Sequence, residues 1–224
     1  MSFGTWNGTH WSHFCGGSII SDRTILSASH CFFLRPNRFG PRGYHFATRI
    51  RIGDQNLNDA TDDRLAKTYT VNTIIRHKKY AGRGIFYDVA LVHTVEKIEF
   101  NGNAAPICMT TVANPEVVIP GEEVAMAGWG YVDDSVDRKP SDTLQETNAQ
   151  ILNRSGCRQR TPGIDDDLII CVGSPVCYVH CIRIELRIIL ITLFRTVKAH
   201  PVRGILVRRW SKNCQLKLEL HSNT

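Results

Sequence analysis

The stretch between Cys15 and Cys31 constrains the fold of this chain more than any other. Two apolar runs, residues 18–20 and 24–26, are separated by a short polar turn, and this pattern predicts a β-hairpin. The two cysteines stand at opposite ends of the hairpin, where a disulfide can join them. His30 directly precedes the second cysteine, so a crosslink there would fix the backbone of this imidazole, as a catalytic base requires.

Two motifs lie in this stretch, Cys15-Gly-Gly-Ser18 and Ser27-Ala-Ser-His30-Cys31. They resemble the trypsin/chymotrypsin-like serine proteases, in which a Cys-Gly-Gly-Ser strand precedes an Ala-Ala-His-Cys segment that carries the base histidine. A lone histidine before a cysteine is structural in most proteins. Two motifs at the family's spacing reverse that judgement, and the resemblance implies that His30 is a general base.

Further segments resemble the same family in the same order. Tyr87-Asp88-Val-Ala-Leu-Val92 is similar to Asn-Asp-Ile-Ala-Leu-Leu, whose aspartate orients the catalytic histidine. An aspartate before an apolar run can also be a plain turn residue. Because the other two motifs occur in the same chain, we favour the catalytic interpretation, and we expect Asp88 and His30 to come within hydrogen-bonding distance. Residues 123–130 resemble the Val-Ala-Gly-Trp-Gly segment, and residues 168–173 resemble Met-Ile-Cys-Ala-Gly.

The resemblance covers about residues 11–173 and implies an all-β fold with two antiparallel β-barrels. Strands are predicted at 2–20, with a turn at Asn7-Gly8, and from alternating polarity at 48–52 and 69–75. The first barrel is nearly complete in this sequence and the second is incomplete. We expect residues 1–173 to form the protease-like domain and residues 174–224 to be a basic tail unrelated to the family.

Charge separates these two parts of the chain. The net charge is +6, yet residues 1–173 hold 18 Lys and Arg against 19 Asp and Glu, whereas residues 174–224 hold 9 against 2. The basic character therefore belongs to the tail, and we expect no nucleic-acid partner. The apolar segment of the tail has an uncharged core of only residues 188–194, far shorter than the roughly 20 residues that span a bilayer. We expect no membrane span.

The eight cysteines include no Cys-x-x-Cys pair, which favours disulfides over zinc and an extracellular, oxidising location. Two glycosylation triplets, at Asn7 and Asn153, agree with secretion, although Met1 is not followed by a signal peptide and we interpret this as a missing N-terminus. The resemblance implies the disulfides Cys15–Cys31 and Cys157–Cys171. The other cysteines receive no pairing: Cys108, Cys177, Cys181 and Cys214.

The acidic loop Asp54–Asp63 is the one candidate for a cofactor. In the family this loop sometimes binds calcium through carboxylate and carbonyl oxygens. A solvated acidic loop is the interpretation we favour, and we expect no other cofactor or metal. The Gly-Asp-Gln-Asn-Leu sequence at 53–57 is similar to arthropod proteases of the clip-domain group.

The resemblance stops after Gly173. The family continues with Asp-Ser-Cys-Gln-Gly-Asp-Ser-Gly-Gly-Pro, whereas this chain reads Ser174-Pro-Val-Cys-Tyr-Val-His-Cys181 and contains no Gly-Asp-Ser-Gly-Gly segment. Because Ser174 precedes a proline, it is a poor nucleophile candidate. The amides of the oxyanion hole and the floor of the specificity pocket are expected to be lost with the segment. We interpret the tail as unrelated sequence, such as a retained intron or a shifted frame produces.

Three functional hypotheses follow. The chain is an active endopeptidase on protein or peptide substrates, with His30, Asp88 and an unrecognised serine; or a non-catalytic homologue that binds a partner; or a truncated product with no stable function. We favour membership of the serine endopeptidase family with catalytic incompetence of this chain. Substrate specificity cannot be inferred, because the pocket that selects the substrate is missing.

Overall fold

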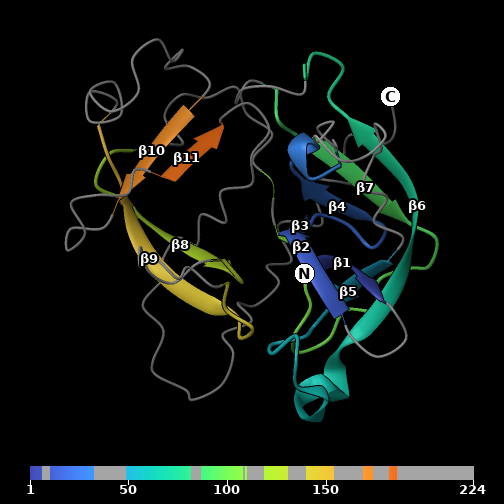
Figure 1. The fold of residues 1–224 in the computed structure, drawn as a ribbon. Helices are drawn as coiled ribbons and strands as arrows, with labels where there is room; N and C mark the ends of the chain where they lie inside the picture. Colours follow the sequence, from blue (N-terminus) through green and yellow to red (C-terminus); the bar gives the residue numbers. More distant parts are fainter. Residues whose placement is uncertain are drawn as a thin grey trace, which may run out of the picture.

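In the described part of the chain, the computed structural model forms eleven β-strands and two short 3₁₀ helices, η1 (Ser29–Phe32) and η2 (Ala60–Leu65), which confirms the all-β expectation. Figure 1 shows two sheets lying side by side, the first formed by the N-terminal half of the chain. The structure describes residues 1–6, 11–32, 49–81, 87–107, 109, 119–130, 140–153, 169–173 and 182–185.

The first sheet has seven strands in the order β2-β1-β5-β6-β7-β4-β3, and neighbouring strands are antiparallel. The longest strand, β6, pairs with β5 along its first half and with β7 along its second half, so it runs the height of the sheet. The strands are β1 (Ser2–Trp6), β2 (Trp11–Gly16), β3 (Ser18–Ile19), β4 (Thr24–Ser27), β5 (Arg49–Ile52), β6 (Lys67–Arg76) and β7 (Ala90–Thr94).

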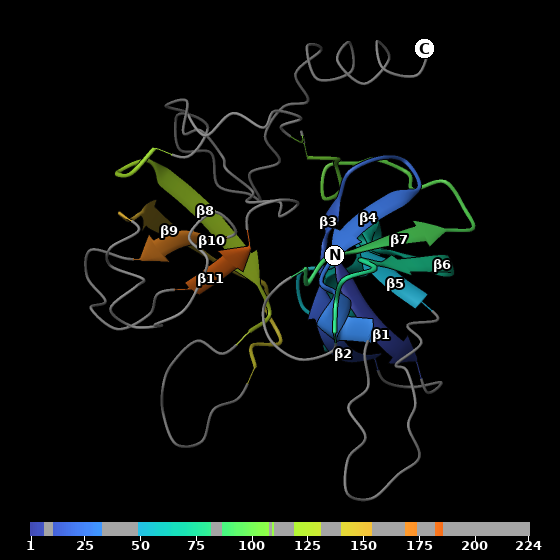
Figure 2. The same cartoon turned by 90° about the horizontal axis from the view of Figure 1, so that it is seen from above.

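The first sheet curls because its two outer strands are one bent segment of chain. Strands β2 and β3 stand at opposite ends of the sheet order, yet only Gly17 separates them in sequence. A Cβ atom at Gly17 would lie 2.6 Å from the carbonyl oxygen of Leu26, so the bend needs a residue without a side chain. Figure 2 shows the resulting rolled arrangement, with β1 to β7 gathered around a common centre.

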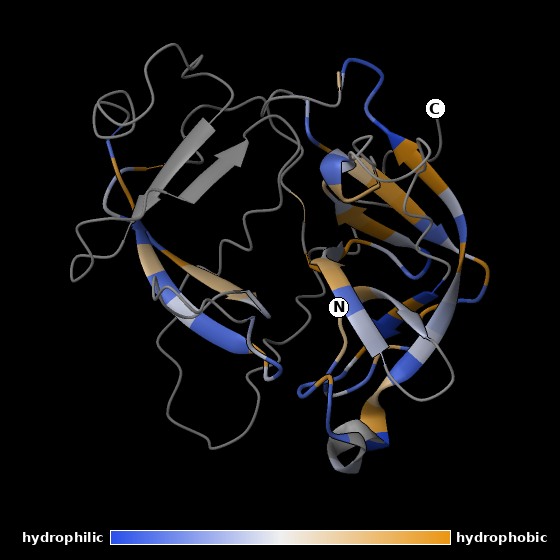
Figure 3. Ribbon diagram, viewed as in Figure 1, coloured by the Kyte–Doolittle hydropathy of each residue, from blue (hydrophilic) through white to orange (hydrophobic). Residues whose placement is uncertain are grey.

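A hydrophobic core fills the inside of the first sheet. Strand β7 contributes Ala90 and Val92, which alternate with less buried residues along the strand, as a half-buried strand requires. Figure 3 shows β7 as largely hydrophobic where it lies between β4 and β6. Phe3 and Phe32 meet edge to face, with ring centroids 5.1 Å apart. The buried core residues are Phe3, Ile19, Ile25, Cys31, Phe32, Ile50, Ile52, Tyr69, Ala90, Val92, Ile98 and Ala104.

The second sheet has four antiparallel strands in the order β11-β10-β9-β8. Strand β11 comes from the part of the chain for which we predicted an unrelated tail, and it pairs with β10. The boundary at residue 173 stays a prediction. The strands are β8 (Glu123–Gly128), β9 (Gln145–Ile151), β10 (Ile169–Gly173) and β11 (Ile182–Glu185).

Backbone hydrogen bonds join the two sheets. The N–H of Leu57 donates to the carbonyl of Asp142 at 3.0 Å, and the N–H of Leu144 donates to the carbonyl of Gln55 at 2.8 Å. The indole N–H of Trp129 also donates to the Gln55 carbonyl, at 3.2 Å. A small second core of Trp11, Leu57 and Trp129, with Leu144 packed against it, lies at this junction.

The predicted strands are largely confirmed. The hairpin at 18–26 is formed by β3 and β4, with Ile19 opposite Ile25. The strands predicted at 48–52 and 69–75 are β5 and most of β6. The turn at Asn7-Gly8 lies outside the described residues. Within the described ranges, no helix is long and apolar enough to cross a membrane.

Candidate active site

His30 and Asp88 are carried by two neighbouring strands of the first sheet. Strand β4 ends at Ser27 and runs directly into η1, which holds His30, while Asp88 stands just before the start of β7. The two strands are antiparallel partners, with Ser27 opposite Ala90. The end of β4 therefore lies beside the beginning of β7, and residues 58 positions apart in sequence meet there.

The Asp88 carboxylate holds both the ring and the backbone of His30. Its Oδ2 lies 2.6 Å from Nδ1 of the imidazole, and its Oδ1 accepts from the backbone N–H of His30, also at 2.6 Å. This confirms the expected approach of the two side chains. Because an ionised carboxylate only accepts hydrogen bonds, we assign the ring proton to Nδ1, which makes Nε2 the acceptor nitrogen of the ring.

The imidazole is open to solvent and the carboxylate is sheltered. The His30 side chain is 58% exposed and that of Asp88 is 17% exposed. A buried serine hydroxyl adds a second link between their segments, since Ser29 Oγ donates to the carbonyl of Val89 at 2.6 Å. An imidazole held in one orientation, with Nε2 as its acceptor nitrogen, can accept a proton, which is the chemistry of a general base.

Sequence reasoning missed how Tyr87 places the carboxylate. This residue immediately precedes Asp88 and adopts a positive φ of 60°, a conformation that costs a non-glycine residue energy and that asparagine adopts more readily than tyrosine. The Tyr87 ring stacks on His77, with centroids 4.9 Å apart and planes 7° apart, and Lys79 Nζ lies 5.3 Å from its centre. The one signal in the sequence was tyrosine at a position where the resembling motif has asparagine.

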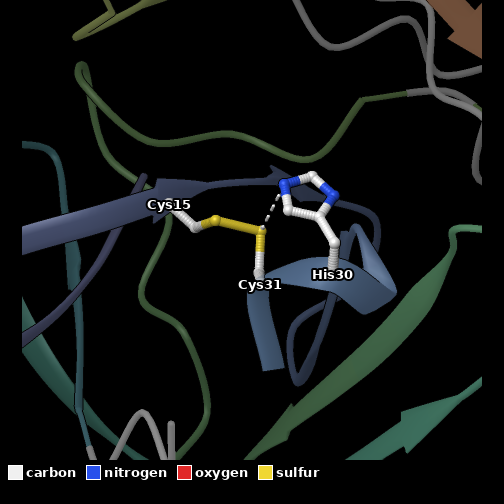
Figure 4. Close-up of side chains that lie close together, drawn as sticks. All are labelled: Cys15, His30 and Cys31. Carbon is white, nitrogen blue, oxygen red and sulfur yellow. Dashed lines mark hydrogen bonds between the residues drawn. A yellow bond between two sulfur atoms is a disulfide. The ribbon is translucent and has the colours of Figure 1, made fainter. Parts of the chain in front are cut away.

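The predicted disulfide Cys15–Cys31 is present, with the two Cα atoms 6.0 Å apart. It ties β2 to η1 beside the imidazole. Sγ of Cys31 lies 3.7 Å from Nε2 of His30, and Figure 4 shows this contact together with the disulfide. The pair Cys157–Cys171 and the remaining cysteines fall outside the part of the chain whose side chains the structure describes, so their pairing stays a prediction.

Two aspartates of the acidic loop, Asp54 and Asp59, already have partners within the protein. Asp54 is buried and forms an ion pair with Arg51, with 2.5 Å between Nε and Oδ2. Asp59 Oδ1 accepts hydrogen bonds from the hydroxyl and the N–H of Thr61, and these two bonds lower the pKa of the Asp59 carboxyl. The side chains of the other two aspartates in the loop are not described. The structure does not test calcium binding here, and a solvated acidic loop stays the favoured prediction.

A second histidine, His13, lies at the junction of the two sheets. Its Nδ1 is 2.7 Å from the buried Ser2 hydroxyl, which also accepts from the indole N–H of Trp11 at 2.9 Å. The imidazole faces the ring of Trp129 across the junction, with centroids 5.6 Å apart. Burial, and after it the nearby N-terminal charge, lower the pKa of His13. His13 lies outside the set of site residues predicted from sequence.

Two antiparallel sheets, with a histidine–aspartate pair at the rim of the first, define a protein of the two-barrel serine-protease class. The family model described as Trypsin matches residues 2–178. The chain belongs to the trypsin family. The match begins at β1 and extends past the end of β10.

Comparison with curated proteins gives the same family. Trypsin II-P29 of Gallus gallus is 30% identical over 161 residues, a match that covers 72% of this chain and 57% of the relative. The clotting factor G beta subunit of Tachypleus tridentatus is 26% identical over 170 residues, covering 72% of this chain and 51% of the relative. The chain thus spans little more than half the length of these relatives.

A solved structure supports the fold. A mouse brain serine protease, neuropsin, superimposes with a TM-score of 0.59 at 21% identity, covering 77% of this chain and 68% of its own. The superposition shows a trypsin-like fold. The expected trypsin-like double-barrel architecture is confirmed at this level.

Proposed function

We propose that this chain is a trypsin-family protein that does not hydrolyse peptide bonds. It holds the base half of a serine-protease site, His30 with Asp88, and lacks a recognisable nucleophile half. The observation that carries the proposal is the absence of a Gly-Asp-Ser-Gly-Gly segment anywhere in the 224 residues, although the chain continues for 51 residues beyond Gly173.

The geometry supports the base half of this proposal. Both hydrogen bonds between Asp88 and His30 are short, and together they fix the orientation of the imidazole, with Nδ1 toward Asp88 and Nε2 beside the Cys31 sulfur. An aligned base contributes roughly 10²–10⁴-fold to a reaction, provided that the nucleophile and the substrate are already positioned beside it. The proposed roles are therefore general base for His30 and orienting carboxylate for Asp88.

The nucleophile half decides the outcome. In a complete serine protease the loss of a triad member still leaves roughly 10³–10⁴-fold catalysis over water, because the oxyanion hole and substrate binding remain. In the trypsin family the two backbone amides of the oxyanion hole lie at the nucleophile and just before it, so they belong to the segment that this chain lacks. Without these groups the base has no serine to deprotonate, and we expect the rate of peptide-bond hydrolysis to be near that of the uncatalysed reaction.

An activity assay with purified full chain tests the proposal. Chromogenic peptides with basic, aromatic or small residues before the scissile bond are offered, together with a fluorophosphonate probe that labels activated serines. Chicken trypsin serves as the positive control. We expect neither turnover above buffer nor labelling.

Matched histidine variants make the assay specific. His30→Ala removes the proposed base, whereas His93→Ala removes a histidine of β7 whose Nδ1 lies 3.2 Å from the Thr24 hydroxyl, outside the His30–Asp88 pair. Stoichiometric serine labelling that His30→Ala abolishes and His93→Ala retains would overturn the proposal and establish an active endopeptidase.

A second candidate function, binding of a protein partner without cleavage, is favoured by the packing of the first core. Every buried residue of that core which the structure describes lies between Phe3 and Ala104, so the segment before the second sheet supplies the described core of the seven-stranded sheet. Cooperative unfolding of the purified chain, followed by tryptophan fluorescence, separates this candidate from an unfolded product. A chain without a cooperative transition would exclude it.

We also propose an extracellular location. The Cys15–Cys31 disulfide supports it, because such bonds persist in oxidising compartments. Expression with an added secretion signal tests the proposal by mass spectrometry. Oxidised Cys15 and Cys31 in the exported chain are expected, and export with both thiols free would contradict it.

A further inference from the structure

The end of β6 carries an exposed patch that lies outside the candidate active site. Ile75, the second-last residue of the strand, is 50% exposed, and Tyr87, in the segment before β7, is 38% exposed. The turn that follows β6 adds two exposed lysines, Lys78 and Lys79. Figure 3 shows the end of β6 as hydrophobic and the loop beyond it as hydrophilic. We call Ile75, His77, Lys78, Lys79 and Tyr87 the β6-end patch.

Hydrogen bonds and ring stacking hold this patch in one arrangement. The N–H of His77 donates to the carbonyl of Val89 at 3.0 Å, so the pairing of β6 with β7 continues beyond the strand. Side chains alternate along a strand, which places Ile75 and His77 on the same side. The His77 ring lies flat on the Tyr87 ring, and Lys79 donates its N–H to Nδ1 of His77 at 3.2 Å. The patch is therefore ordered before a partner binds, which lowers the entropic cost of binding.

The two lysines of the patch differ from the other lysines that the structure describes, which are two in number. Lys67 and Lys97 each form an ion pair with a carboxylate. Lys78 and Lys79 form no ion pair with any carboxylate of the described ranges. The acid nearest to them in sequence, Asp88, is sheltered and is already held in the candidate active site. The β6-end patch thus presents positive charge that the described part of the chain does not neutralise.

The strained backbone at Tyr87 contributes to the form of this patch. Residues at a positive φ cost energy when they are not glycine, and they gather at functional sites. The next residue, Asp88, turns its carboxylate toward His30, while the ring of Tyr87 stays on His77. The conformation therefore lets two adjacent side chains point to different places, one into the candidate active site and one onto the patch.

We propose that the β6-end patch is the docking surface for an acidic segment of a partner protein, one that carries an apolar side chain among its carboxylates. The carboxylates meet Lys78 and Lys79, and the apolar side chain covers Ile75 beside the stacked rings. An apolar centre with a charged rim is the usual anatomy of a protein interface. An acidic polysaccharide would match the charge but would leave Ile75 uncovered. The proposal rests on the second candidate function, binding without cleavage, and names its surface and its kind of partner.

Titration of the full chain with a defined peptide, followed by NMR, tests the proposal. The probe is acetylated Asp-Asp-Glu-Leu-Glu-Asp, and its control is Asn-Asn-Gln-Leu-Gln-Asn, which lacks the carboxylates. Because residues 174–224 hold 9 Lys and Arg against 2 Asp and Glu, the affinity is taken from the patch's own signals. The acidic probe is expected to shift the amides of residues 75–79 and 87–89 with a dissociation constant below about 1 mM, and to leave residues 94–97 unshifted. The control peptide should shift none of them.

Matched lysine variants test the charge of the patch. The double replacement Lys78→Gln with Lys79→Gln should weaken the acidic probe roughly fivefold, since each exposed charge contributes little by itself. The double replacement Lys67→Gln with Lys97→Gln lowers the net charge equally, at lysines that already have carboxylate partners. It should change the affinity less than roughly twofold. Equal weakening by the two double variants would show general charge attraction and would overturn the proposal.

A second matched pair tests the apolar part of the patch. Ile75→Thr keeps a β-branched residue in the strand and should weaken the acidic probe roughly threefold through the lost apolar contact. Val95→Thr alters a residue with a similar exposure, 51%, at the other end of β7, and should leave the affinity unchanged. An unchanged affinity of the Ile75→Thr variant would indicate a site for polyanions in general and would overturn the proposal.

The outcomes separate this proposal from the function on which it rests. A chain that unfolds cooperatively, yet whose patch signals do not shift with several millimolar probe, would overturn the docking surface alone. A chain without a cooperative transition would overturn both the docking surface and the second candidate function. Shifts confined to residues outside the β6-end patch and residues 87–89 would likewise overturn the docking surface.

Discussion

Asp88 accepts two hydrogen bonds from one residue, His30: one from the backbone N–H and one from the ring, each 2.6 Å long. The carboxylate thus fixes the start of η1 and the orientation of the imidazole at the same time. Because the acceptor sits just before β7 and the donors just after β4, the pair also joins the ends of two neighbouring strands. The same carboxylate therefore stabilises the fold and orients the imidazole of the site.

The first prediction follows from that double role. Asp88→Ala removes the acceptor of the His30 N–H, a hydrogen bond at an exposed position, and we expect a loss of about 0.5–1.5 kcal/mol in the free energy of unfolding. Asp88→Asn keeps one oxygen for the N–H and should lose less than half as much. Urea denaturation of both variants measures the difference. Equal losses would show that the backbone hydrogen bond contributes nothing.

The second prediction concerns the strained backbone at Tyr87. Tyr87→Asn and Tyr87→Val both remove the ring that stacks on His77, but only valine is β-branched at a φ of 60°. We expect the valine variant to be less stable than the asparagine variant by about 1–2 kcal/mol. Thermal unfolding of the two variants side by side makes the comparison. The reverse order of stability would rule out the proposed strain.

The third prediction concerns the disulfide. Cys15 and Cys31 close a loop with a sequence separation of 16. Chain-entropy reasoning for a loop of this length gives a stabilisation of about 3 kcal/mol, so the double replacement Cys15→Ser with Cys31→Ser should lose about that amount. Guanidinium denaturation with and without reductant measures it. Reductant should destabilise the parent chain by more than it destabilises the double variant.

The fourth prediction concerns pH. Because burial lowers the pKa of His13, the folded state binds its proton less tightly than the unfolded state, whose histidine pKa is about 6.5. This contribution to stability is full above pH of about 6.5 and is lost as the pH falls toward the folded pKa, by at most about 1.4 kcal/mol per pH unit. Denaturation midpoints between pH 8 and pH 5 should fall less steeply in His13→Gln. An unchanged slope would exclude His13 as the cause.

The fifth prediction concerns the acidic loop. Asp54 is already neutralised by Arg51, and Asp59 is engaged by Thr61, so we expect calcium to add little. The melting temperature with millimolar calcium and with excess chelator should agree within about one degree. A bound ion at 100 times its dissociation constant would stabilise by about 2.7 kcal/mol, so a rise of several degrees would show that the loop binds calcium.

The sequence was sufficient for those features that local motifs encode. The β3–β4 hairpin, the Cys15–Cys31 bond and the approach of Asp88 to His30 follow from short segments whose spacing is preserved. Each depends either on residues that are close in sequence or on two motifs that occur together in the family. Periodicity placed β5 and β6 for the same reason.

The contacts between distant segments could not be predicted. The stack of Tyr87 on His77 and the contact between the rings of His13 and Trp129 depend on where the folded strands bring side chains together. The sequence around these residues does not indicate which residue each one contacts. The strand β11 was missed for a related reason, since its pairing with β10 depends on the geometry of the second sheet.

The position of the first core in the chain has a consequence for synthesis of the protein. His30, Asp88 and every described residue of that core precede residue 105, whereas the second sheet begins at Glu123. Because chains emerge from the ribosome N-terminus first, the imidazole and its carboxylate can meet while the second sheet is still being translated. Trp11 packs against Trp129 in the folded chain, so its contact with Trp129 forms only after the second sheet has been translated. Docking of the second sheet onto the first is therefore the late step in folding.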